Sequence, residues 1–245
     1  MSATRSETLR EDSLATAEGY RFASGCLWSA GDPRSADTPV NSWRYRYIKR
    51  ALDVVCSLIM IVVFAIPGLL IAAAIVLTSK GPVFYSEERI GRDGRSFRIW
   101  KFRSMHRNAA QHRHIASPKA CKELPHWRMQ KHLRDPRITK VGEFLRCWSL
   151  DELPQLFNVL RGEMSLIGPR PIVEVETTFY GDLLSYYLAA TPGLSGLWQV
   201  SGRSHIDYDK RVRLDASYVR SWSLQTDVKI LYRTVFVVLG RVGAR

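Results

Sequence analysis

The sequence predicts an α-rich α+β fold, in which a monotopic membrane element precedes a cytosolic, mainly helical domain with one small β-hairpin. Residues 54–79 carry no charge, residues 81–105 alternate apolar and polar side chains, and apolar residues recur at helical spacing after residue 138. Residues 1–41 are rich in Ser, Ala and Thr without any periodicity. We therefore expect a disordered tail at residues 1–41, a membrane helix at residues 42–80 and a folded domain at residues 81–245.

The membrane helix is predicted from the uncharged run "VVCSLIMIVVFAIPGLLIAAAIVLTS" at residues 54–79. About 20 apolar residues are enough to cross a hydrocarbon core. Basic residues prefer the cytoplasmic side of a membrane, but here they flank the run on both sides. Pro67 in its centre predicts a break, so the helix is expected to be re-entrant and to leave on the face that it entered. An ordinary kinked span remains the alternative, because proline also occurs in spanning helices.

An acidic residue, Asp53, stands at the edge of the uncharged run. Arg50 and Lys49 precede it by three and four residues, which places both cations on its side of a helix. We therefore predict an Arg50–Asp53 pair at the membrane interface, since an acid at this depth is tolerated when it is paired. A solvated charge beside the membrane is the alternative.

The folded domain is predicted to begin with a hairpin at residues 81–105, whose turn is the Arg92-Asp93-Gly94 segment. Helical spacing then follows at Val141, Phe144, Leu145 and Trp148, and again from Leu153 to Leu160 before Gly162. Two late helices are expected near residues 205–220 and 225–239. The last one is apolar with few charges, so it either packs on the core or lies in the membrane interface.

The chain is strongly basic, with a formal net charge of +13 over 245 residues. Such a charge favours a polyanion as partner: nucleic acid, acidic lipid or a phosphorylated substrate. Nucleic acid is not expected as the partner, because the sequence contains no nucleic-acid recognition motif. It contains instead the uncharged run that predicts a membrane helix. The four cysteines form no Cys-x-x-Cys pair, and the five histidines between residues 106 and 134 match no metal-ligand spacing.

An acidic pair, Asp151 and Glu152, is the first candidate for chemistry. Ser149 and Glu152 have capping-box spacing, while Asp151 as the cap would place Pro154 in the first helical turn. Either arrangement puts both carboxylates at a helix N-terminus, a position that favours anions. If a phosphate binds there, a Mg²⁺ ion is expected between the negative groups, and Asp151 can attack phosphorus as a nucleophile. A plain capping box is the alternative.

Cationic residues accompany the acidic pair along the sequence. Arg170 is held between two prolines in Gly168-Pro169-Arg170-Pro171, and arginine binds phosphate through two parallel hydrogen bonds. The stretch "TPGLSGLWQVSGR" adds glycines that permit close approach, one indole and a further arginine. Together these residues predict a diphosphate site beside a membrane surface. The other cations of the predicted lining are Lys101, Arg103, Arg146 and Arg203.

Several of these stretches together resemble the bacterial sugar transferase family, the monotopic phosphoglycosyl transferases. They are "KRALD", "GPVFYSEERIG", "WKFRSM", "SLDELPQLFNVLRGEMSLIGPRP", "PGLSGLWQVSGR" and "TDVKIL", spread over residues 48–239. The resemblance implies transfer of a hexose 1-phosphate from a UDP-sugar to undecaprenyl phosphate, with release of UMP. It implies that Asp151 carries the sugar phosphate covalently and that Glu152 binds Mg²⁺. The phosphates would be supported by Lys101, Arg146 and Arg170, with Asp227 as a further functional acid and Arg203 nearest the nucleotide.

The resemblance is strongest to undecaprenyl-phosphate galactose phosphotransferases of exopolysaccharide synthesis. It implies a re-entrant helix in the bacterial inner membrane, an active site on the cytoplasmic face, and contact with membrane lipids. The family breaks this helix at a Ser-Pro pair, which reads Ile66-Pro67 here. We expect no additional N-terminal four-helix region of the kind found in larger relatives. The sequence does not determine which sugar is transferred or the oligomeric state, and a non-catalytic membrane scaffold is the alternative to an enzyme.

Overall fold

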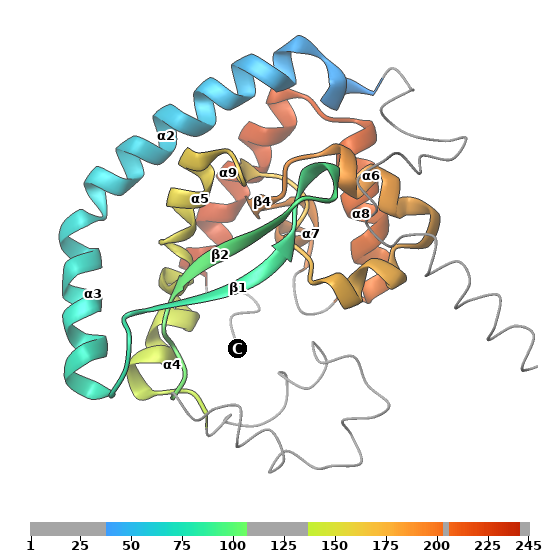
Figure 1. The fold of residues 1–245 in the computed structure, drawn as a ribbon. Helices are drawn as coiled ribbons and strands as arrows, with labels where there is room; N and C mark the ends of the chain where they lie inside the picture. The colour runs from blue at the N-terminus through green and yellow to red at the C-terminus, as the bar shows by residue number, and fades with distance from the viewer. Residues whose placement is uncertain (1–37, 107–136, 203–205, 241–245) are drawn as a thin grey trace, which may run out of the picture.

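The structure is a computed structural model that describes residues 38–106, 137–202 and 206–240 (Figure 1). The first described element is a 3-10 turn, η1 (Pro39–Asn41), followed by a π-helical segment, η2 (Arg44–Lys49). Val40 in this turn is only 1% exposed and belongs to the core. The folded chain therefore begins before residue 42, because residues 38–41 of the predicted tail are anchored by a buried side chain.

The segment predicted to enter the membrane is a bent pair of helices, α2 (Arg50–Val63) and α3 (Ala65–Thr78). Among the described residues, no single helix has the length and apolar composition of a membrane span. The segment Arg44–Val63 taken with Ala65–Thr78, bent by 60°, meets these criteria. The break lies at Phe64, three residues before the predicted Pro67. A proline ring clashes with the carbonyl four residues earlier, here that of Val63, which explains why the helix breaks one turn upstream.

The bent pair forms an arch along one side of the molecule (Figure 1). Its inner side contacts α5 and β3 through α2, and α4 through α3. Its outer side is strongly apolar and exposed: Val62, Ile66, Leu69 and Leu77 are 71–84% exposed. Folding therefore leaves the uncharged run with an apolar face that the rest of the described chain does not cover.

The predicted hairpin is confirmed, with strands β1 (Phe84–Ile90) and β2 (Ser96–Phe102) paired antiparallel. The turn lies at Arg92–Gly94, as predicted, and Asp93 and Gly94 both adopt positive φ, 58° and 74°. Asp tolerates the left-handed region better than most residues, and glycine adopts it freely. The turn residues thus fix the register that opposes Tyr85 to Lys101.

The predicted helices that follow the hairpin are also confirmed. Helix α4 (Lys140–Cys147) starts at Thr139, whose hydroxyl accepts the Gly142 N–H at 2.8 Å. Helix α5 (Gln155–Arg161) ends at Gly162, which has φ 83°. The remaining helices are η7 (Glu174–Phe179), η8 (Gly181–Leu183), α6 (Leu184–Ala189), α7 (Leu197–Val200), α8 (Tyr208–Arg220) and α9 (Leu224–Leu239).

Helix α9 packs one side on the core, as one of the two predicted alternatives had it, and leaves an apolar side exposed. Ile230 is 2% exposed and packs in the core, whereas Val228, Tyr232 and Leu239 are 63–66% exposed. An exposed apolar face on a helix of this length is typical of an interfacial helix.

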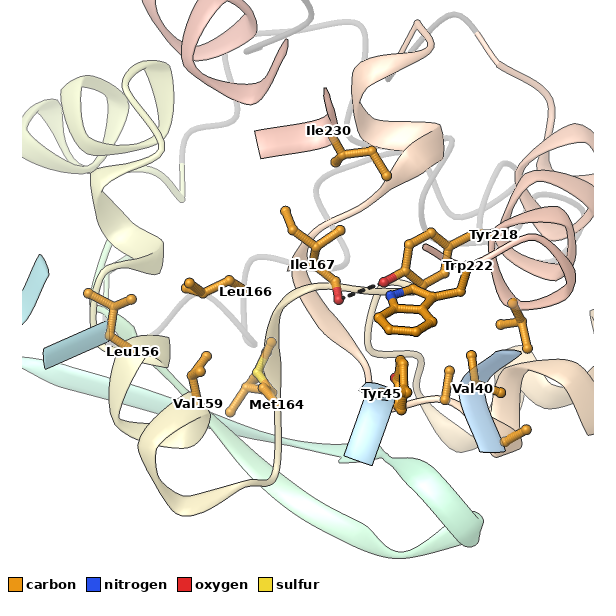
Figure 2. Packing of buried hydrophobic residues seen from close by; sticks show 14 residues of the cluster. Val40, Tyr45, Leu156, Val159, Met164, Leu166, Ile167, Tyr218, Trp222 and Ile230 are labelled. Carbon is orange, nitrogen blue, oxygen red and sulfur yellow. Dashed lines mark hydrogen bonds between the residues drawn. The ribbon is translucent and has the colours of Figure 1, made fainter. Parts of the chain in front are cut away.

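A short parallel pair, β3 (Ser165–Ile167) with β4 (Gly193–Ser195), is not predicted by the sequence. Three residues are too few for an alternation of side chains to show, and both strands end among glycines and prolines. The pair lies beside the main core, where Figure 2 shows Ile167 of β3 with its carbonyl hydrogen-bonded to the hydroxyl of Tyr218 at 3.1 Å. It joins the middle of the chain to α8.

The predicted Arg50–Asp53 interface pair is wrong. The guanidinium of Arg50 donates to the carbonyls of Val159 and Leu160 at the C-terminal end of α5, the second at 2.6 Å. Asp53 is buried and accepts the N–H of Leu166 at 3.1 Å. Both side chains of α2 therefore hold neighbouring elements, because orphan carbonyls and N–H groups are brought to them by tertiary packing.

Candidate active site

The acidic pair lies on a single 3-10 turn, η6 (Leu150–Glu152), just before α5. The structure forms neither of the two caps that the sequence allowed: Ser149 makes no side-chain cap bond, and α5 is preceded by Pro154 rather than capped by Asp151. Ser149 instead adopts the left-handed conformation with φ 56°, which is strained for a residue with a side chain. Asp151 is 8% exposed, so the sharp turn holds a carboxylate mostly out of water.

Lys101 of β2 binds the second acid of the pair. Its ammonium lies 2.8 Å from Oε1 of Glu152. The contact depends on how α5 is docked, since the buried Asn158 accepts the N–H of Trp100 at 3.1 Å and donates to the carbonyl of Arg98 at 2.7 Å. These bonds dock the middle of α5 against the hairpin and so hold Glu152, three residues before the helix, near β2.

Arg146 reaches the same region from α4. Its Nε donates to the hydroxyl of Ser104 at 2.9 Å, and its positive charge acts on Asp151. Arg103, which the sequence placed in the same cationic lining, is buried elsewhere. It donates to the carbonyl of Ser79 at 2.7 Å and to its hydroxyl at 2.8 Å, and so closes the C-terminal end of α3.

The loop that carries Arg170 is held on both sides. Gly168 donates to the carbonyl of Ser195 at 2.9 Å, and Gly193 donates to that of Pro169 at 2.7 Å. On the other side, Ile90 of the hairpin donates to the carbonyl of Ile172 at 2.9 Å. As a result, Nη1 of Arg170 lies 4.0 Å from Oε1 of Glu152, the oxygen that Lys101 also contacts.

The glycines around Arg170 serve a different purpose from the one predicted. A Cβ on Gly193 would lie 2.1 Å from the nitrogen of Gly168, and a Cβ on Gly168 would lie 2.4 Å from the carbonyl oxygen of Thr191. The two glycines therefore permit the close approach of β3 and β4 to each other, which positions the arginine.

A small cavity of about 10 Å³ lies between these elements. Three of its charged lining groups were predicted: Lys101, Glu152 and Arg170. Arg89 and Gln155 also line it and were missed, because each has only the local pattern of an ordinary strand or helix residue. Arg89 is placed by Glu176, whose Oε2 lies 3.8 Å from its Nη1. Asp151 does not line this cavity but directly precedes Glu152, which does.

The groups around Asp151 shift the pKa of its carboxyl in opposite directions. Burial raises the pKa of its carboxyl, and so does the negative charge of Glu152, while Lys101 and Arg146 lower it. A cation between the two carboxylates would relieve the repulsion. Mg²⁺ is commonly held by one or two carboxylates together with substrate phosphates, so the donor set of Asp151 and Glu152 fits such a substrate-completed site. No group of three or more potential ligand side chains occurs within the part of the chain that the structure describes.

Two other predicted site residues do not join the acidic pair in the structure. Asp227 is buried at the start of α9 and accepts from Lys49 at 2.7 Å, Tyr218 at 2.8 Å and Trp222 at 3.0 Å. It does not line the cavity beside Glu152. Its hydrogen bonds link η2 to α8 and α9. Arg203 lies outside the described residues.

Comparison with known proteins matches nearly all of the described residues to one family. The family model for "Bacterial sugar transferase" matches residues 44–241. An undecaprenyl-phosphate galactose phosphotransferase of Salmonella typhimurium is 49% identical over 208 residues, which cover 81% of this chain and 42% of that relative. The exopolysaccharide production protein ExoY of Rhizobium meliloti is 44% identical over 191 residues, 76% of this chain and 83% of the relative.

A UDP-glucose:undecaprenyl-phosphate glucose-1-phosphate transferase of Klebsiella pneumoniae is 38% identical over 208 residues, 82% of this chain and 42% of the relative. The chain thus spans 42% of the length of the galactose and glucose transferases.

Proposed function

The chain belongs to the bacterial sugar transferase family, and on this premise we propose that it transfers a hexose 1-phosphate from a UDP-sugar to undecaprenyl phosphate. This reaction would begin the membrane stage of exopolysaccharide or another surface glycan. The observation that carries the proposal is the acidic pair on η6, with Lys101 and Arg170 directed at Glu152 and the charge of Arg146 acting on Asp151. The names of the similar galactose and glucose transferases both refer to undecaprenyl phosphate, which supports this acceptor.

The proposed chemistry consists of two displacements at one phosphorus atom. A carboxylate oxygen of Asp151 attacks the phosphorus that bears the sugar, and the bond to the bridging oxygen of the diphosphate breaks, so UMP leaves with the electron pair. A phosphate oxygen of the lipid then attacks the same phosphorus and releases the Asp151 carboxylate. Two inversions leave the configuration at phosphorus unchanged, and the kinetics should be ping-pong.

The cations beside the acids have distinct parts in this scheme. Arg170 can bind two phosphate oxygens at once through its planar guanidinium. Lys101 provides a point charge that offsets the negative charge gathered around the reacting phosphorus. Glu152 and Asp151 would hold Mg²⁺, which when bound supplies a positive charge to the phosphate oxygens.

The transferase proposal predicts release of UMP from purified protein given undecaprenyl phosphate and a UDP-sugar. A screen of UDP-galactose, UDP-glucose and UDP-N-acetylated sugars, scored by UMP, will identify the donor. Chelation by EDTA should remove the activity and added Mg²⁺ should restore it, because two carboxylates alone would repel the donor phosphates. No UMP from any of these donors, with Mg²⁺ and lipid present, would favour a non-catalytic scaffold.

The charges around Asp151 predict how the rate depends on pH. Only the ionised carboxylate attacks, and the pKa of Asp151 is raised above the ordinary value. As the pH is lowered, kcat/KM should therefore begin to fall at a higher pH than it would with an exposed aspartate. Lys101 lowers that pKa, so Lys101→Met should move the acid limb to still higher pH. The measurement is the pH profile of kcat/KM, with Lys140→Met on the exposed start of α4 as control. An acid limb that stays in place in Lys101→Met would contradict this assignment.

We also propose that the bent helix pair enters and leaves the inner membrane on the cytoplasmic face. Basic residues precede the pair and follow it, and its outward face is apolar. This attachment would hold the acidic pair near the depth of a lipid phosphate.

Re-entry predicts that both ends of the bent pair react with a membrane-impermeant thiol reagent from the same side. Single cysteines placed within residues 1–40 and within residues 90–130, in a background without the native cysteines, should both be labelled in inverted vesicles and protected in intact cells. Labelling of the two segments from opposite sides would show a kinked span instead.

A further inference from the structure

A second, larger cavity of about 110 Å³ lies away from the acidic pair. It is lined by residues of η2 and the start of α2, by the turn of the hairpin and by the region after α5. It shares no lining residue with the cavity beside Glu152. Its volume is several times the roughly 10–15 Å³ needed for one water molecule, so a phosphate group has room.

The charged side chains that line this cavity are mostly cationic: Arg46, Lys49, Arg50 and Arg92 against Asp53. Lys49 is 4% exposed, and of its three N–H donors one is given to Asp227 at 2.7 Å. One carboxylate oxygen of Asp53 accepts a hydrogen bond from the N–H of Leu166. The acid is thus partly satisfied by backbone, while the buried ammonium keeps donors available.

Two arginines that line the cavity, Arg46 and Arg92, have no ion pair within the described part of the chain that would occupy their guanidinium groups. Arg50 closes the end of α5, whereas Arg46 and Arg92 form no ion pair with any residue that the structure describes. Arg92 comes from the hairpin turn and lies 5.8 Å from the centre of the Tyr45 ring. Arg46 is exposed at the mouth. Two unpaired guanidinium groups beside a buried ammonium form a site that favours an anion.

The position of the cavity indicates where the anion comes from. Trp43 and Tyr47, close in sequence to the lining residues Tyr45 and Arg46, are 61% and 65% exposed, and the exposed apolar face of α2 begins at Leu52. Exposed aromatic residues next to an apolar helix lie at the level of lipid headgroups. The acidic pair precedes the other end of α5, a helix of seven residues and so about 10 Å long.

We propose that this cavity is a second anion site that binds a phosphate group, supplied by a membrane lipid headgroup. The inference rests on the proposed membrane attachment and not on the transfer reaction. Phosphate in a lipid headgroup and free phosphate share the chemistry that the cations recognise, and experiment distinguishes them.

The test compares two double variants of the full-length protein with the same change in net charge. Arg46→Gln/Arg92→Gln removes the unpaired guanidinium groups of the cavity. Arg44→Gln/Arg95→Gln removes exposed arginines from the same two segments that do not line it. Retention of phosphatidylglycerol or phosphatidylcholine by the detergent-purified protein is measured by native mass spectrometry. The unfolding temperature is measured with and without inorganic phosphate, against chloride at equal ionic strength.

The expected result is phosphatidylglycerol retention at least about tenfold weaker in the cavity variant than in the control variant, with similar unfolding temperatures in the absence of ligand. Loss of lipid retention in the cavity variant, with or without loss of the phosphate effect, supports the headgroup as the source. Loss of a phosphate effect alone overturns the lipid source. Equal retention and equal phosphate response in the two variants overturn the site. Asp151→Asn in the UMP assay tests the transferase proposal separately.

Discussion

Replacing Asp151 with asparagine is expected to lower the rate of UMP release by about a thousandfold or more. Asparagine has nearly the same shape, so the turn of η6 should be kept. Its amide, however, carries no negative charge and cannot attack phosphorus as a carboxylate does. The measurement is UMP release with saturating donor and undecaprenyl phosphate, together with the unfolding temperature of the variant.

The covalent step can be observed directly in the unmodified protein. Incubation with the donor and no lipid acceptor should add the mass of one sugar phosphate to the peptide that contains Asp151, and the variant should show no such mass. Asp182→Asn, an exposed aspartate on η8, is the control and should keep full activity. Full UMP release by Asp151→Asn would show that another group is the nucleophile.

The second large effect is expected at Asp227, and it is an effect on folding. Asp227 accepts hydrogen bonds from Lys49, Tyr218 and Trp222, and the Lys49 side chain is itself 5% exposed. Asp227→Asn leaves the Lys49 ammonium buried without the carboxylate that it contacts directly. Loss of one partner of a buried pair costs about 3–5 kcal/mol of unfolding free energy. Chemical denaturation of the purified protein should show this loss.

A double-mutant cycle separates the pair from its surroundings. Lys49→Met alone should also destabilise, but Lys49→Met with Asp227→Asn should cost clearly less than the sum of the two, because no unpaired charge then remains. Asp209→Asn, an exposed aspartate on α8, is the control. An Asp227→Asn protein that folds with unchanged stability but does not release UMP would show a direct role in the reaction. The resemblance to the family implied such a role.

Local patterns in the sequence predicted the elements whose causes are local. The hairpin turn at Arg92–Gly94 is fixed by residues that accept positive φ, and α5 ends at Gly162 for the same reason. The grouping of Lys101 and Arg170 about the acidic pair was also expected, though from the motif that these residues share with the family rather than from their spacing. The bend of the helix pair α2–α3 was predicted from Pro67 but occurs one turn earlier, at Phe64.

Tertiary packing decided the partners of buried charges. Arg50 and Asp53 have the spacing of a helical pair, yet each binds backbone groups from elements more than 100 residues away in the chain. Arg89 is held at the cavity both by Glu87 of its own strand and by Glu176, which only the fold brings to it. Such partners cannot be seen in a periodicity, because a buried charge pairs with whatever polar group the fold brings to it.

The sequence by itself determined the apolar run, the turns, most helices and the family to which the chain belongs, since these depend on residues close in sequence or on long shared motifs. Only the tertiary structure decided that β3 and β4 pair, that Asp227 holds Lys49, and that a second cationic cavity forms beside the hairpin turn. The physical reason is that each of these depends on groups far apart in the chain, which meet only when the core has formed.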